Sequence, residues 1–142
     1  MKVNLTLDAQ NTLNGYENIN LVEMGTYDLT AVCDAEAKEI LANNVLQTCI
    51  YPKLKEVLAL WIKKLRLGGK LVVCGIEGYS VAAKYNSMEI SLEDFNKLIY
   101  GNHSVSVVNC EEVVDWLIEL GLTITKKKIQ GISFVVEGER NE

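Results

Sequence analysis

The sequence has one proline, one histidine and fewer basic than acidic residues. Its 14 Lys and Arg against 19 Asp and Glu give a net charge of −5, which argues against binding to nucleic acid or to an anionic membrane surface. No apolar run approaches the length of a signal-peptide core or a membrane span, so we expect a cytoplasmic protein. Because no linker or low-complexity stretch interrupts the chain, residues 1–142 are predicted to form a single domain.

The cysteines carry no signal for a metal site or a disulfide framework. Cys33, Cys49, Cys74 and Cys110 are widely separated, without a Cys-x-x-Cys pair or a nearby histidine. Zinc sites and disulfide-rich folds need such clustering. We therefore predict no bound metal, and we expect all four side chains to pack as small apolar groups in the interior.

Strand and helix patterns alternate along the chain. Short β-branched and apolar runs predict strands, and apolar residues at helical spacing predict helices. The expected strands are 3–6, 16–22, 39–45, 71–76, 123–129 and 132–137, and the expected helices are 52–65, 91–100 and 110–120. This order implies a mostly parallel sheet with right-handed crossovers, closed by a C-terminal antiparallel hairpin. The predicted fold class is therefore α/β, a Rossmann-like sandwich.

The predicted fold indicates where a ligand would bind. In an open parallel sheet, ligands lie beyond the carboxyl ends of the strands, where the strand order reverses. Here these positions follow the strand 3–6 and follow Val45. Tyr79 and Tyr85 come after the strand 71–76 and are weaker candidates for lining the mouth of that cleft. Trp61 and Trp116 lie on the apolar stripes of their helices, so we expect both in the core.

Several short motifs occur in the order found in one known family. The segment Lys64-Leu65-Arg66-Leu67-Gly68-Gly69-Lys70-Leu71-Val72 resembles the L-K-P-G-G-x-L stretch before the fifth strand of class I S-adenosylmethionine-dependent methyltransferases. The chain is most similar to the small methyltransferases predicted in bacteria and their phages. Further matching segments are Asn4-Leu5, Gly15-Tyr16-Glu17-Asn18-Ile19-Asn20, Ala42-Asn43-Asn44-Val45-Leu46-Gln47-Thr48 and Leu98-Ile99-Tyr100-Gly101. The resemblance covers nearly the whole chain and implies a methyltransferase sandwich with an S-adenosylmethionine site.

The sequence departs from the family at the residues that would hold this cofactor. The Gly-rich turn after the first strand is replaced by Thr6-Leu7-Asp8, whose side chains occupy space that the cofactor would need. Asn20 stands where the family has a carboxylate for the ribose hydroxyls. In the third motif, Asn44, Gln47 and Thr48 replace two histidines and a glutamate, so no general base remains there. We expect weak or absent binding of S-adenosylmethionine.

Two acidic residues and the histidine each allow two interpretations. Asp8 could hold a ligand amine or cap the turn after the first strand. Asp28 resembles the family's carboxylate near the adenine, but an Asp at a turn is more often a local cap. His103 resembles a family histidine after the helix 91–100, or is simply solvated in its loop. The candidate cofactor-binding residues are thus Thr6, Asp8, Asn20, Asp28 and Asn44, and no catalytic residue is identified.

Two functions follow from the resemblance and its departures. The first is a methyltransferase-like protein with an eroded cofactor site, which serves as a non-catalytic binding or assembly module. The second is an active methyltransferase for an unknown small molecule or protein. The apolar composition and the open edge of the final hairpin predict a homo-oligomer or a larger protein complex. Lys126, Lys127 and Lys128 would guard this edge, and neither nucleic acid nor a membrane is an expected partner.

Overall fold

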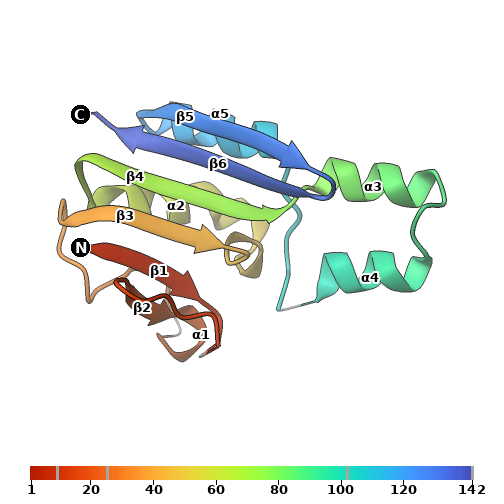
Figure 1. The fold of residues 1–142 in the computed structure, drawn as a ribbon, viewed down its shortest axis with the longest axis horizontal. Coiled ribbons are helices and arrows are strands. Elements are labelled where there is room, and N and C mark those ends of the chain that lie inside the picture. The colour runs from red at the N-terminus through yellow and green to blue at the C-terminus, as the bar shows by residue number, and fades with distance from the viewer. Residues whose placement is uncertain (9, 25, 102, 142) are drawn as a thin grey trace.

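The computed structural model describes residues 1–8, 10–24, 26–101 and 103–141 (Figure 1). The strands are β1 (Lys2–Thr6), β2 (Glu17–Asn20), β3 (Ala37–Asn43), β4 (Leu65–Ile76), β5 (Leu122–Gln130) and β6 (Ser133–Arg140). The helices are α1 (Leu21–Met24), α2 (Leu54–Lys64), α3 (Gly78–Asn86), α4 (Leu92–Tyr100) and α5 (Cys110–Glu119), with 3-10 turns η1 (Leu46–Thr48) and η2 (Tyr51–Lys53).

The strands form one sheet in the order β2-β1-β3-β4-β6-β5. Strands β1 to β4 are parallel to one another, whereas β6 runs antiparallel to both β4 and β5. The predicted α/β class, mostly parallel sheet and C-terminal antiparallel hairpin are confirmed. The strand order reverses at β1, because β2 pairs on one side of it and β3 on the other.

The core lies between this sheet and the helices α2 and α5, which are drawn behind the sheet in Figure 1. Residues of the four inner strands are fully buried in this core, including Val3 and Leu5 of β1 and Ile40 of β3. Helix α2 contributes Leu58 and Trp61 to the same cluster, and Trp61 is 0% exposed. The expected core position is therefore confirmed for Trp61, whereas Trp116 is only partly buried against this core.

Several predicted boundaries differ from those of the structure, and two of the differences have clear local reasons. The second strand ends at Asn20 rather than residue 22, because the Asn20 side chain caps the short helix α1 that begins at once. The strand expected at 71–76 begins earlier, because β4 starts at Leu65, directly after α2 ends at Lys64. Gly68 (φ +78°) allows an irregular stretch of β4 between the pairs Ala37↔Leu65 and Glu39↔Lys70.

Helix α3 was not predicted from the sequence. It carries Tyr79, which is exposed, and Tyr85, whose ring lies 4.6 Å from that of Phe95 in α4. Both tyrosines therefore belong to the helical pair α3–α4, which extends past the carboxyl end of β4 in Figure 1. Neither lines the cavities described below.

The cysteine and lysine predictions hold in part. Cys49 and Cys110 are buried and Cys74 is half-buried, and burial raises the pKa of all three thiols. Cys33 is exposed, so the expectation of an interior position is wrong for it.

The Lys126–Lys128 run is exposed on β5, the edge strand where it was expected. Among the described residues, no helix has the length and apolar character needed to cross a membrane.

Candidate functional site

A cavity of about 550 Å³ opens at the carboxyl ends of β1 and β3. Its walls are the end of β1 with the loop that follows it, Asn43 and Asn44 at the end of β3, and His103. This is the position that the predicted topology indicates for a ligand, beside the strand at which the order reverses. Amide and hydroxyl side chains dominate its polar lining, and Asp8 and His103 are its two titratable residues.

The first predicted segment lies in this cavity with its polar groups paired internally. The Thr6 hydroxyl donates to the carbonyl oxygen of Asp8 at 2.7 Å and accepts from the Asp8 N–H at 3.2 Å. The Asp8 carboxylate accepts from the backbone N–H groups of Gln10 and Asn11 at 2.9 and 3.1 Å, and from the Asn11 side-chain amide. Asp8 therefore caps its own turn, which is one of the two roles considered for it.

Asn20 and Asp28 line neither this cavity nor the smaller one beside it. The Asn20 Oδ1 accepts from the N–H groups of Val22 and Glu23 at 3.0 and 3.1 Å, so it serves the start of α1. At the next turn, the Thr26 hydroxyl accepts from the Asp28 N–H at 3.3 Å. The Asp28 carboxylate is exposed and makes no hydrogen bond to any described residue, so the expected capping role of its side chain is wrong.

The third motif contributes Asn44 to the wall of the larger cavity and Thr48 to the wall of the smaller one beside it. Asn44 adopts φ +56°, which ends β3 and leaves its exposed side chain at the wall of the larger cavity. The side-chain amide of Gln47 donates to the Asn44 carbonyl oxygen at 2.6 Å. The Gln47 carbonyl oxygen in turn accepts from the N–H groups of Val105 and Ser106 at 2.8 and 3.1 Å. This carbonyl therefore holds the segment that follows His103.

A smaller cavity of about 260 Å³ adjoins the larger one, since Leu7 and His103 line both. Its other walls include Leu21 and Val22 at the start of α1, and the pair Tyr27 and Thr48. The hydroxyls of Tyr27 and Thr48 lie 2.7 Å apart, and the Thr48 hydroxyl also donates to the Val45 carbonyl oxygen. Thr48 is thus engaged within the protein, as Thr6 and Asp8 are.

His103 lines the site although the sequence analysis did not include it among the candidate cofactor-binding residues. Its side chain is exposed, in keeping with a solvated loop, yet it lines both cavities, and its backbone takes φ +63°. Asn43, Gln10 and Tyr27 also line the cavities without having been singled out. Asn43 directly precedes a predicted site residue, so its place at the strand end was the signal that could have identified it.

The described ranges 1–8, 10–24, 26–101 and 103–141 hold no group of three His, Cys, Asp or Glu side chains that could bind a metal ion. The larger cavity is lined by amides, hydroxyls, the Asp8 carboxylate and one histidine, besides its apolar residues.

Comparison with solved structures identifies the fold. The chain matches an S-adenosylmethionine-dependent methyltransferase of Archaeoglobus fulgidus over 96% of its length and 74% of that chain, with 10% identity and a TM-score of 0.60. It matches a methyltransferase of Thermotoga maritima, described as a possible histamine N-methyltransferase, over 89% of its length and 65% of that chain, with 14% identity and a TM-score of 0.62. The chain has the methyltransferase fold.

A third neighbour shows how much smaller this chain is than some proteins with the methyltransferase fold. An O-methyltransferase family protein of Burkholderia thailandensis matches 89% of this chain at 16% identity and a TM-score of 0.59, but only 36% of that protein is covered. Comparison with protein-family models gives no match, and comparison with curated proteins gives none either.

Proposed function

We propose that this chain is a methyltransferase-like module whose S-adenosylmethionine site is eroded, and that it works as a non-catalytic binding or assembly unit. The observation that carries this proposal is that the Asn20 side chain already serves as a helix cap. Its side-chain oxygen, at the position where the sequence resemblance places a carboxylate for the ribose, already accepts from Val22 and Glu23. A neutral amide oxygen that caps a helix is a poor acceptor for a ribose diol, because charge-assisted bonds are about twice as strong as neutral ones.

Two further observations support the same conclusion. Thr6 and Asp8 stand where the family keeps small residues, and their polar groups pair with each other and with the turn that follows. Asn44, Gln47 and Thr48 have no group that can accept a proton near neutral pH. A general base commonly contributes a factor of about 10² to 10⁴ to a rate, so its loss from this motif favours a non-catalytic role.

Calorimetric titration of the full chain with S-adenosylmethionine and with S-adenosylhomocysteine tests the proposal. We expect a dissociation constant weaker than about 100 µM for both, since each 1.4 kcal/mol of lost interaction weakens binding about tenfold. Low-micromolar binding of either compound would overturn the eroded-site proposal.

A second candidate function, an active methyltransferase, is favoured by one specific observation. His103 places an imidazole beside both cavities, where it could accept a proton from a substrate held at the strand ends. The test is the formation of S-adenosylhomocysteine from S-adenosylmethionine over a panel of amine, phenol and protein acceptors. An active enzyme would lose about 10² or more of that rate in His103→Gln, while its affinity for S-adenosylhomocysteine stayed the same.

A further inference from the structure

Helix α4 has an amphipathic sequence and yet buries no side chain completely. Leu92 at its start and Tyr100 at its end are 59% and 72% exposed, and Met88 in the preceding turn is 91% exposed. The contact of α4 with the rest of the chain is mainly its pairing with α3, where Phe95 meets Tyr85. A nine-residue helix is marginal on its own, and exposed apolar residues gathered on one element mark a contact surface.

One ridge of α4 has apolar residues at both ends and an amide at its centre. Leu92, Asn96 and Tyr100 follow one another at a spacing of four, so they form a single ridge along the helix. Glu93 and Lys97 form the next ridge, with their charged groups 3.2 Å apart. These five residues line a shallow hollow of about 610 Å³. Apolar residues thus stand at both ends of the face, with an amide and two opposite charges between them.

Such a face is complementary to a second copy of itself. If two α4 helices pack antiparallel about a two-fold axis at Asn96, Leu92 of one copy lies opposite Tyr100 of the other. Glu93 of each copy then lies within reach of Lys97 of the other, which gives two cross-helix attractions of opposite charges. The Asn96 side chain donates to the Leu92 carbonyl oxygen at 2.9 Å, and its own Oδ1 accepts from no described residue. That oxygen can accept from the Asn96 amide of the second copy.

We propose that this face of α4 (Leu92, Glu93, Asn96, Lys97 and Tyr100) is the contact surface of a two-fold symmetric dimer of the chain. The charge pattern favours a second copy of the chain as the partner. In a two-fold symmetric contact, Glu93 of each copy meets Lys97 of the other, so both charges of the face are matched by an opposite charge. One short helix buries less than the about 800 Å² per partner of a standard interface, so the dimer is weak, with a dissociation constant of tens of micromolar. It would form whether or not the cavities hold a ligand.

Sedimentation velocity of the full chain, from about 5 µM to about 500 µM, measures the expected dimerisation. Glu93→Lys brings two lysines together across the axis, and Lys97→Glu brings two glutamates together, so each variant should weaken the dimer at least about tenfold. An equimolar mixture of the two variants should dimerise again, because every contact then joins opposite charges. The double variant Glu93→Lys/Lys97→Glu should dimerise by itself for the same reason.

The rescue by mixing separates contact across the interface from damage to α4 itself, since a folding defect in one variant is not repaired by a second protein. Lys38→Glu is the matched control, because it makes the same change of charge at an exposed position on β3 and should leave the dimer unchanged. The proposal is overturned if the unmodified chain stays monomeric at the highest concentration. It is equally overturned if the single variants dimerise as well as the unmodified chain, or if their mixture fails to recover.

Discussion

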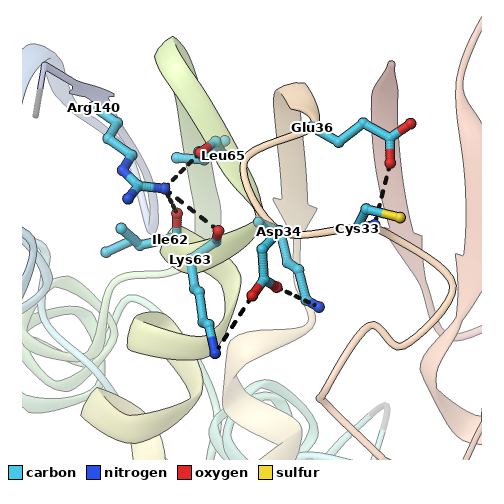
Figure 2. Close-up of polar contacts among 8 residues, drawn as sticks. Cys33, Asp34, Glu36, Ile62, Lys63, Leu65 and Arg140 are labelled. Carbon is cyan, nitrogen blue, oxygen red and sulfur yellow. Dashed lines mark hydrogen bonds and ion pairs between the residues drawn. The ribbon is translucent and has the colours of Figure 1, made fainter.

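Arg140 donates a hydrogen bond of 2.6 Å from Nη1 to the carbonyl oxygen of Leu65, the residue at which α2 gives way to β4. The same nitrogen lies 3.3 and 3.4 Å from the carbonyl oxygens of Ile62 and Lys63. Figure 2 shows Arg140 pointing toward these three carbonyl groups. A cation is thus placed at the negative end of the helix dipole, where carbonyl groups lack partners within the helix. The last strand residue thereby ties β6 to the end of α2, away from the cavities.

Replacing this guanidinium should lower stability without touching the site. Arg140→Met removes charge-assisted hydrogen bonds to backbone carbonyls, and we expect the free energy of unfolding to fall by about 1 to 3 kcal/mol. Urea denaturation of both proteins measures this loss in the free energy of unfolding. Arg66→Met is the matched control at an exposed position and should change stability by less than about 0.5 kcal/mol. Equal losses in the two variants would show that the carbonyl contacts are not what stabilises the end of α2.

Asp34 provides a pH-dependent contribution at the same end of α2. Its carboxylate lies 2.9 Å from Nζ of Lys64 and 3.4 Å from Nζ of Lys63 (Figure 2). The hydrogen bond from Lys64, followed by the charges of both lysines, lowers the pKa of Asp34 below its ordinary 3.8. The unfolded chain therefore takes up this proton first, so the stabilisation is complete above the ordinary pKa and is lost as the pH falls through the lowered one.

Asp34→Asn should accordingly be less stable than the unmodified chain at pH 7, and the difference should shrink once the pH falls below 3.8. Chemical denaturation across this range gives the difference at each pH. Asp28→Asn, which removes an exposed carboxylate without a hydrogen bond to any described residue, should give a small difference at every pH. A difference for Asp34→Asn that does not depend on pH would contradict the ion-pair explanation.

The two tryptophans should differ in what they contribute to stability. The Trp61 side chain is 0% exposed and its indole N–H donates to the Tyr27 carbonyl oxygen at 3.1 Å. We expect Trp61→Ala to lower the free energy of unfolding by about 3 to 5 kcal/mol. Trp116 is half-buried against the Tyr51 ring, so Trp116→Ala should cost clearly less in the same denaturation experiment. A cost below about 1 kcal/mol for Trp61→Ala would show that the indole is not packed in the core.

The sheet could be predicted from the sequence because its strands are short runs of β-branched and apolar residues. Helix α3 could not, because the sequence before it lacks the residues that usually mark the start of a helix. The segment before α3 has no Ser, Thr, Asp or Asn to mark a helix start. Its first turn is instead capped by the Glu77 carboxylate, and by Asn109, which accepts from the Tyr79 N–H across a separation of 30 residues. Asn109 directly precedes α5, yet its side chain makes no capping hydrogen bond to that helix.

Some residues of the candidate site could likewise be placed from the sequence, and others could not. Thr6 and Asn44 could be placed together from sequence, because the carboxyl ends of neighbouring parallel strands meet at one edge of a sheet. His103 could not, since its place depends on the Gln47 carbonyl oxygen that holds the following segment. Side-chain roles were harder still, because Asn20 and Asp8 pair with backbone groups that only the folded turns bring near.

Glu77 should be a strong determinant of stability despite lying outside the site. This residue is 3% exposed, and its carboxylate accepts from the N–H of Tyr79 in α3 and from the N–H of Cys110 in α5. Glu77→Ala would deprive the first residue of α5 of its buried acceptor, and we expect a loss of at least about 2 kcal/mol. Glu17→Ala, at an exposed strand position, is the control in the same urea titration. If Glu77→Ala lowered the free energy of unfolding as little as Glu17→Ala, the shared capping of α3 and α5 would not matter for stability.

Restoring a carboxylate at residue 20 should strengthen cofactor binding, if the site is eroded as proposed. Asn20→Asp keeps an oxygen to cap the N–H groups of Val22 and Glu23 and adds a second, charged oxygen at the end of β2. Hydrogen bonds to charged groups exceed neutral ones by about 1 kcal/mol, so we expect S-adenosylhomocysteine to bind about five- to tenfold more tightly by calorimetry. Asn14→Asp makes the same substitution at an exposed loop position and should leave the affinity unchanged. An equal gain in both variants would point to net charge, and no gain in Asn20→Asp would mean that this strand end does not face a ribose.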